Sequence, residues 1–142
     1  MSIEIEIAGH GGYLKIEILE YENPSAQDLS DANWLSCNVI ARVGAFSSSL
    51  NASFTTHDFV QFRNELQELM AKQKSTASFI TDEEQLSLRV DMGNAGIVSV
   101  EGTLQTYDMP RASLVFSFES DMSFLAKTIS GLRNLVKELN LI

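Results

Sequence analysis

The sequence predicts a single α+β domain over residues 1–142, in which antiparallel strands form meanders and two amphipathic helices pack on one sheet face. Apolar and polar residues alternate in about eight short segments, which is the period of a half-buried strand. Two longer segments repeat apolar residues at helical spacing. Each helical segment follows a run of strand segments, and this order is typical of antiparallel sheets rather than of strands that alternate with helices.

The first half of the chain contains alternating segments that we interpret as strands. They are residues 3–7, 13–19, 34–43 and 50–55. A glycine-rich turn at 9–12 joins the first two segments and indicates a hairpin. The apolar pattern then stops from Glu20 to Asn33, where Asn, Pro, Ser, Asp and Gln dominate. This composition predicts a long loop, and its length makes it a candidate for function.

A first helix is expected after the fourth strand segment. Thr55 or Thr56 supplies an N-cap oxygen, and Asp58 lies in the first turn, where the helix dipole favours a carboxylate. The apolar residues end at a basic segment over 72–75, which suits a helix C-terminus. The stripe that they form contains Phe59, Phe62, Leu66, Leu69 and Met70. We expect this stripe to be buried.

The second half repeats this order with different residues. Its expected strands are residues 77–81, 86–90, 98–104 and 114–118. Ser120 is the expected N-cap of a second helix, with Asp121 at the first helical position. The second apolar stripe contains Leu125, Ile129, Leu132, Val136 and Leu139. Each half therefore ends in a strand with phenylalanine, a short polar cap and an amphipathic helix, which we interpret as an internal echo.

Composition and charge exclude several classes of protein. The chain has 19 Asp and Glu against 10 Lys and Arg, which gives a formal net charge of −9. This charge repels phosphate backbones, so nucleic acid is not an expected partner. The N-terminus lacks a basic region followed by an apolar stretch, and no window approaches the roughly 20 apolar residues of a membrane span. We expect a cytoplasmic protein with no membrane partner.

The residues that could carry catalysis or bind a metal are few and scattered. Cys37 is the only cysteine, so no disulfide can form within the chain, and its place on an apolar strand face is typical of a small buried residue. His10 and His57 lie in no spacing that matches a metal pair or a catalytic triad. The sequence therefore predicts no catalytic residue, no metal, no cofactor and no enzymatic activity.

The loop before the only tryptophan is the predicted partner-binding segment. It lies outside the alternating pattern and has no apolar face on which to bury its carboxylates. The predicted binding residues are Glu20, Glu22, Asp28, Asp31, Asn33 and Trp34. In a structural interpretation, the tryptophan packs at the rim of the core, and the Asn and Asp side chains satisfy backbone groups. In a functional interpretation, the segment is an acidic and aromatic contact surface for a basic protein.

Residues in and around this loop resemble a known family. The segment 15–19, the pair Asn23-Pro24 and the segment Asp31–Leu35 resemble the opening of the WapI-type immunity proteins of bacterial contact-dependent toxin systems. A polar-capped helix after the fourth strand and a C-terminal amphipathic helix are also similar to that family. The resemblance in order spans nearly the whole chain. Its most specific piece is Asp31–Leu35, in which family members often have glycine at the place of Ala32.

The resemblance implies a protein that binds and neutralises a cognate secreted toxin domain. Because the chain is acidic, we expect a basic nuclease whose active-site cleft is covered by an acidic face, since opposite charge speeds association. If the loop lies outside the interface, the sheet face around Glu4, Glu6 and Glu17 is the next candidate. The alternative is a small-molecule-binding or regulatory α+β domain without catalysis, which a deep apolar pocket between sheet and helices would favour.

Overall fold

Eight antiparallel strands form two four-stranded sheets within residues 3–140, the part of the chain that the computed structural model describes apart from the side chains of residues 29 and 30. The first sheet contains, in order, β1 (Ile3–Ala8), β2 (Gly12–Tyr21), β3 (Trp34–Val43) and β4 (Phe46–Thr55). The second contains, in order, β5 (Thr76–Ile80), β6 (Leu86–Met92), β7 (Ile97–Gln105) and β8 (Ser113–Asp121). The helices are α1 (Leu29–Ala32), α2 (Thr56–Met70) and α3 (Met122–Glu138), with a 3₁₀ turn at Asn94–Gly96.

Each half of the chain is a meander of strands followed by a long helix, which confirms the predicted α+β class and antiparallel order. The differences are local. β4 begins at Phe46 rather than at residue 50, and β8 continues to Asp121. The short helix α1 lies inside the predicted loop, where the sequence analysis expects no regular element.

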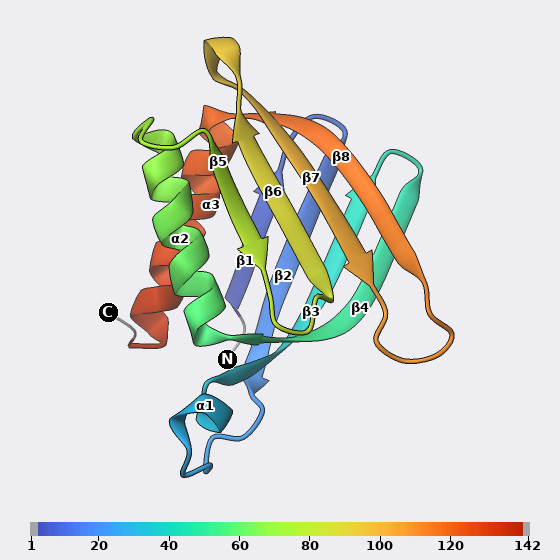
Figure 1. Ribbon diagram of the computed structural model, residues 1–142, viewed down its shortest axis with the longest axis vertical. Coiled ribbons are helices and arrows are strands. Elements are labelled where there is room, and N and C mark those ends of the chain that lie inside the picture. Colours follow the sequence, from blue (N-terminus) through green and yellow to red (C-terminus); the bar gives the residue numbers. More distant parts are fainter. Residues whose placement is uncertain (1–2, 141–142) are drawn as a thin grey trace.

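The two sheets face one another and enclose the core (Figure 1). In β2, Leu14, Ile16 and Ile18 are at most 1% exposed, whereas Lys15 and Glu17 lie on the opposite face. The buried apolar side chains of both sheets form one cluster with those of α2 and α3. The two halves therefore share a single core, and neither half can bury its apolar faces alone.

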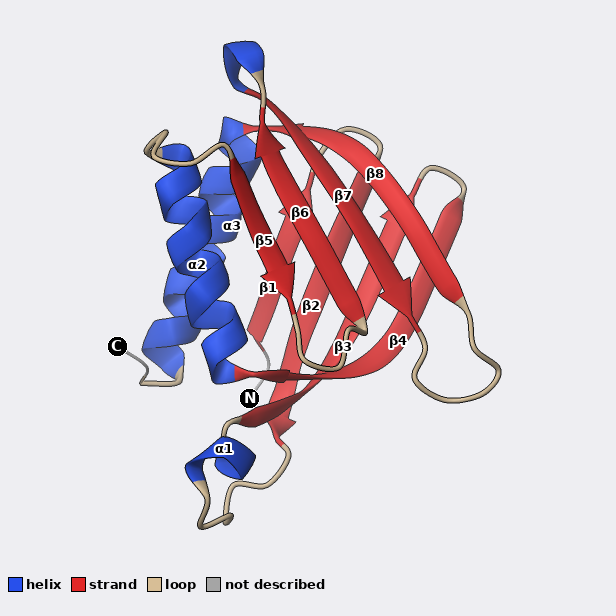
Figure 2. Cartoon of the chain, in the orientation of Figure 1, coloured by secondary structure: helices blue, strands red, loops and turns tan. Residues whose placement is uncertain are grey.

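The helices α2 and α3 lie next to each other along one side of the two sheets (Figure 2). α2 contacts β5 and α3 contacts β1, so the helices cover the edge strands of both sheets on that side. Both predicted stripes are buried: Phe62 is 1% exposed and Leu132 is 0% exposed. The helices are together on one side, as expected, but they lie against sheet edges because the inner face of each sheet is covered by the other sheet.

Side-chain caps fix the first residues of both long helices. Thr55 is the N-cap of α2 and forms a capping box with Asp58: the Asp58 N–H donates to the Thr55 hydroxyl at 3.2 Å, and the Thr55 N–H donates to the Asp58 carboxylate at 2.8 Å. In α3 the N-cap is Asp121, whose carboxylate accepts two backbone N–H groups of the first turn. The prediction that Ser120 caps this helix is therefore wrong by one residue.

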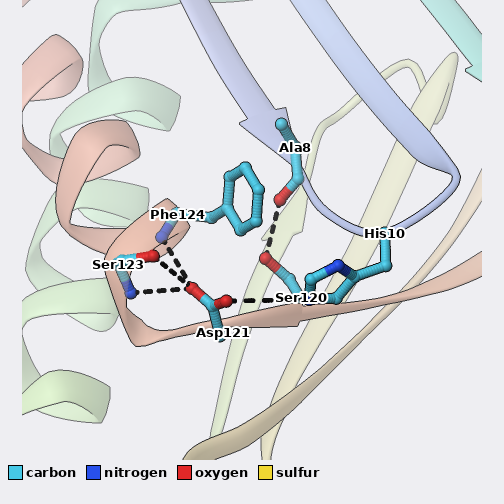
Figure 3. Close-up of polar contacts among 6 residues, drawn as sticks. All are labelled: Ala8, His10, Ser120, Asp121, Ser123 and Phe124. Carbon is cyan, nitrogen blue, oxygen red and sulfur yellow. Dashed lines mark hydrogen bonds and ion pairs between the residues drawn. The ribbon is translucent and has the colours of Figure 1, made fainter.

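Polar contacts join the β1–β2 turn to the second half of the chain (Figure 3). The Ser120 hydroxyl donates to the Ala8 carbonyl at 2.6 Å, and the His10 N–H donates to the Glu119 carbonyl at 2.7 Å. The His10 imidazole also lies 3.6 Å from the Asp121 carboxylate. The first hairpin thereby holds the free edge of β8 at the point where α3 begins.

The β5–β6 turn makes the corresponding contact with β4 through Gln85. Its Nε2 donates to the Asn51 carbonyl at 3.1 Å, and its Oε1 accepts the Ser53 N–H at 3.1 Å. Gln85 is 7% exposed, so water competes little for these bonds. Each half thus holds the outer edge of the last strand of the other half, and no local sequence signal reveals this arrangement.

Candidate functional site

The predicted binding loop projects beyond the end of the two sheets (Figure 1). It spans residues 22–33, includes α1 and begins later than predicted because β2 is longer. Both ends of the loop are fixed: the Glu22 N–H donates to the Trp34 carbonyl at 3.0 Å, and the Thr56 N–H donates to the Asn33 carbonyl at 3.0 Å. The first sheet and the start of α2 therefore hold the base of the loop.

A β-bulge in β2 decides where the first predicted carboxylate points. The register between β2 and β3 shifts after Ile18, so that Ile18 pairs with Cys37 while Glu20 pairs with Ser36. Without the bulge, regular alternation would place Leu19 on the outer face and direct Glu20 into the core together with Ile18. With the bulge, Glu20 lies exposed on the outer face of the first sheet.

Glu22 and Trp34 lie at the same end of this outer face. The Glu22 carboxylate accepts a short hydrogen bond from the hydroxyl of Ser53 on β4. Trp34, the first residue of β3, is half-buried. The structure thus brings Glu20, Glu22 and Trp34 together beside the base of the loop.

Asp28 and Asp31 belong to the projecting part of the loop, and both are exposed. The Asp28 carbonyl accepts the backbone N–H groups of Asp31 and Ala32, at 3.1 and 3.0 Å, and this turn forms α1. Asn33 is half-buried and contributes its carbonyl to the base of the loop. The six predicted residues are therefore divided between the sheet and the projecting segment.

Carboxylates predominate on the outer face of the first sheet. We call this surface the acidic face and define it by Glu4, Glu6, Glu17, Glu20 and Glu22. Glu4 lies directly opposite Glu17 on the neighbouring strand, where like charges destabilise the pair. Lys15 lies 3.8 Å from Glu4 and opposite Glu6. One ammonium group cannot neutralise this many carboxylates, so the acidic face keeps an excess of negative charge.

The outer face of the second sheet has a smaller excess of carboxylates, because Arg89 lies there with Asp91, Glu101 and Glu119. Arg89 lies 2.9 Å from the Asp91 carboxylate and pairs across the strands with Glu101. The hydrogen bond from the Thr76 hydroxyl and the contact with Arg89 lower the pKa of Asp91. On the first sheet, Arg42 lies at the far end of the outer face from the loop. Both outer faces are therefore acidic, and the larger excess of carboxylates lies on the acidic face.

The chemistry of the candidate reactive residues is that of structural groups. Within residues 3–140, no cluster of three or more His, Cys, Asp or Glu side chains forms a metal site. Cys37 is 0% exposed, and burial, with a smaller effect of Glu22, raises the pKa of its thiol to about 12. Ser123 and His10 both contact the carboxylate of Asp121 from opposite sides, so the histidine cannot activate the hydroxyl as in a catalytic triad (Figure 3).

The interior is packed with core side chains. Phe54, Phe79 and Leu135 are among the buried residues that fill the space between the sheets and the helices. This is the place where the alternative, ligand-binding interpretation expects a pocket.

None of the helices within residues 3–140 has both the length and the apolar character needed to cross a membrane.

Comparison with solved structures gives similarities at low sequence identity. The MRP1/MRP2 proteins of Trypanosoma bruciei match with a TM-score of 0.49 and 10% identity, over 98% of this chain and 83% of theirs. WHY1 from Arabidopsis thaliana matches with a TM-score of 0.47 and 12% identity, over 96% of this chain and 83% of that chain. The plant transcriptional regulator PBF-2 matches with a TM-score of 0.48 and 13% identity, over 96% of this chain and 80% of that chain. At these scores the similarities carry no functional argument.

Comparison with curated proteins gives no significant match. The family comparison, in contrast, covers nearly the whole chain. The profile of the Immunity protein WapI-like family matches residues 4–140, from β1 to the end of the α3 region, and this range contains the acidic face and the projecting loop. The chain belongs to the WapI-like immunity protein family.

Proposed function

We propose that the protein is a cytoplasmic, non-catalytic immunity protein that neutralises a basic toxin domain, expected to be a nuclease, by covering it with the acidic face and the projecting loop. Family membership supports the immunity role. The proposal of a basic toxin depends on one observation, the uncompensated charge of the acidic face. A nuclease binds a polyanion, so its cleft presents the complementary positive charge.

The acidic face contributes first to the rate of association. A chain with a net charge of −9 attracts a basic partner over a distance set by salt, which is about 8 Å at physiological ionic strength. Glu4 and Glu17 repel each other in the free protein because they lie directly opposite. A lysine or arginine of the toxin that binds between them removes this repulsion, so the pair favours the complex over the free state.

Occlusion is the second contribution. Carboxylates at alternate positions of a strand lie about 6 to 7 Å apart on one pleated face. Such a surface can cover a groove that otherwise admits nucleic acid. The toxin is then inhibited by binding alone, without any chemical reaction. The segment around α1 lies beyond the end of the sheets (Figure 1), and its exposed residues Asp28 and Asp31 add carboxylates with which a basic partner can pair.

Co-expression tests the immunity role. The probe is the toxic C-terminal domain encoded by a gene next to the gene for this chain. We expect cells that express both proteins to survive and the two proteins to purify together. Continued killing in the presence of well-expressed, folded protein would contradict the proposed role for that toxin.

Charge-reversal variants locate the surface. The first variant carries Glu17→Lys and Glu20→Lys on the acidic face, and the second carries Asp28→Lys and Asp31→Lys on the loop. A matched control, with Glu101→Lys and Glu119→Lys, makes the same change in net charge on the outer face of the second sheet. We expect the first two variants to slow association with the inactive toxin domain and to flatten its salt dependence more than the control does.

Each outcome of this series has a distinct meaning. An unchanged association rate in the loop variant removes Asp28 and Asp31 from the interface and leaves the acidic face. Equal effects in all three variants show that net charge alone matters and contradict a localised acidic interface. Surface changes usually alter stability by less than about 0.5 kcal/mol, so we expect each variant to fold. Far-ultraviolet circular dichroism checks this expectation.

A further inference from the structure

One end of the second sheet presents a group of exposed apolar side chains. Among the described side chains, which do not include that of Leu29, the exposed large apolar residues are Leu19, Phe46, Ile80, Ile97, Tyr107, Met109 and Val115. Ile80 ends β5, Val115 lies near the start of β8, and Tyr107 and Met109 lie in the β7–β8 loop. We call these four residues the apolar end. A concentration of exposed apolar residues is typical of a surface that binds another protein.

Hydrogen bonds between Thr106 and the residues before β8 close the base of the β7–β8 loop. The Thr106 N–H donates to the Ala112 carbonyl at 2.9 Å, and the Ala112 N–H donates to the Thr106 hydroxyl oxygen at 2.8 Å. The Thr106 hydroxyl also lies within hydrogen-bond distance, 3.1 Å, of the Pro110 carbonyl. Tyr107 and Met109 are nonetheless 60% and 80% exposed. The hydrogen bonds therefore order the base of the loop, from which these side chains project, and this order reduces the backbone entropy lost on binding.

A chain of hydrogen bonds connects this loop to the acidic face. At the base of the loop, the Gln105 N–H donates to the Gln85 carbonyl at 3.0 Å, and the Gln105 side chain donates to the Glu84 carbonyl at 2.7 Å. The Gln85 side chain accepts the N–H of Ser53, whose hydroxyl binds Glu22 of the acidic face. In Figure 1 the loop and α1 extend from the same end of the molecule. The outer faces of the two sheets point in opposite directions, so one partner can contact both regions by docking across this shared end, where Glu22 and the β7–β8 loop lie.

The charges around the apolar end indicate the chemistry of its partner. Glu83, Glu84 and Asp108 are exposed beside it. A surface hollow of about 390 Å³, lined in part by Glu83, Tyr107 and Arg111, separates the β5–β6 turn from the loop. Apolar anchors surrounded mainly by carboxylates fit a partner with apolar pockets in a basic surface. Two copies of this chain would instead bring these carboxylates together, which disfavours self-association at this end.

We propose that the apolar end is a second contact region for the same basic toxin domain, with Tyr107 and Met109 as anchors that enter apolar pockets of the toxin. This inference rests on the proposed function and assigns different kinetic roles to the two contact regions. The acidic face sets the association rate, because long-range charge acts before contact. The anchors set the dissociation rate, because their gain comes from side chains that lose contact with water once the complex has formed.

Dissociation kinetics test this division. The inactive toxin domain is immobilised, and dissociation is followed for the parent protein and for a variant with Tyr107→Ala and Met109→Ala. The matched control carries Phe46→Ala and Ile97→Ala, which truncate two exposed apolar residues at the opposite end of the sheets. We expect the first variant to dissociate about tenfold faster or more, with an association rate within about twofold of the parent, and the control to match the parent.

The outcomes separate this inference from the proposed function. If the parent binds and the Tyr107 and Met109 variant dissociates at the parent rate, the apolar end is not a contact region, and the immunity role stands. A loss confined to the association rate also contradicts the role of the two residues as anchors. If the parent protein does not bind the toxin domain at all, the proposed function fails together with this inference. Because both side chains are exposed, their truncation is not expected to unfold the protein.

Discussion

Asp121 illustrates how one carboxylate fixes the start of a helix and makes it sensitive to pH. Its Oδ1 accepts the N–H groups of Ser123 and Phe124 at 2.9 and 3.1 Å, and it also accepts the Ser123 hydroxyl. The hydroxyl bond is the largest cause of the lowered pKa of Asp121, followed by the bond from the Phe124 N–H, and the nearby His10 contributes further. The folded protein therefore holds this group in its charged form.

The lowered pKa of Asp121 determines how the stability of the protein changes with pH. A carboxyl group with a lowered pKa in the folded state stabilises the protein above its unfolded pKa, about 3.9, and this contribution is lost as pH falls through the folded pKa. Asp121→Asn removes the titration and leaves an oxygen that can still cap the helix. We expect the difference in free energy of unfolding between parent and variant to shrink as pH falls below about 5.

Urea unfolding at a series of pH values measures this difference. Asp108→Asn is a suitable control, because Asp108 lies in an exposed loop that caps no helix, and its replacement removes the same formal charge. A difference between the parent and the Asp121 variant that stays constant down to pH 2 would contradict the role of the charged form.

At the scale of elements, the two long helices end in the same way but with different residues. After α2, Lys72 adopts a left-handed conformation with φ of 60°, and after α3, Asn140 does so with φ of 56°. The Lys72 N–H donates to the Leu69 carbonyl at 3.0 Å, and the Gln73 N–H donates to the Glu68 carbonyl at 2.9 Å, which together form a Schellman motif. Asparagine tolerates this conformation, whereas lysine adopts it at a steric cost.

Replacing Lys72 by glycine is therefore expected to stabilise the protein by about 1 kcal/mol, because glycine reaches the left-handed conformation without a steric penalty. Thermal or urea unfolding measures the change. Lys72→Ala removes the same charged side chain but keeps Cβ, and it is expected to leave stability near that of the parent. Equal stabilisation by both variants would show that charge, not backbone conformation, explains the effect.

Most elements could be predicted because each has a local signature. Alternation identified the strands, and the spacing of residues such as Phe62 and Leu132 identified the buried helix faces. The bulge at Leu19 was not predicted, since a single extra apolar residue looks like the end of a strand rather than a shift in register. The predicted N-cap of α3 was wrong by one residue because Ser120 and Asp121 are equally good caps in sequence. In the structure Asp121 caps the helix, and the Ser120 hydroxyl bonds to β1 instead.

The candidate site was predictable only in part, because its arrangement depends on contacts between residues that are distant in the sequence. Glu20 and Glu22 were recognised as carboxylates outside the apolar pattern, but their place beside Glu4 and Glu17 depends on the bulge and on pairing between strands. Tyr107 lies between the seventh and eighth expected strands, in a segment for which the sequence analysis makes no functional prediction. Exposure of an apolar side chain depends on what packs over it, and this information is not local.

At the scale of the whole molecule, alternation shows that one face of each sheet is buried but does not show what covers it. The two sheets cover each other, and their side chains form one cluster with both long helices. Gln85 and His10 then tie each half to the last strand of the other half. An isolated half would expose the apolar face of its sheet, so we expect the halves to fold as one cooperative unit.

Equilibrium unfolding in urea tests this cooperativity with two probes. Fluorescence of Trp34, the only tryptophan, reports on the first half, and far-ultraviolet circular dichroism at 222 nm, the usual helix wavelength, reports on α2 and α3 together. We expect the two transitions to coincide. Gln85→Ala leaves the Asn51 carbonyl and the Ser53 N–H without their partner, at a cost of about 1 to 3 kcal/mol, and is expected to move both transitions together.

Gln61→Ala, on the exposed face of α2, is the control and is expected to leave both midpoints near those of the parent. A fluorescence transition at lower urea than the circular dichroism transition, in the parent or in the Gln85 variant, would show that the first half unfolds alone. Because the acidic face and the apolar end lie on different halves, their relative position in the free protein depends on this cooperativity. A protein whose halves unfold separately could not present both regions in a fixed arrangement to one toxin domain.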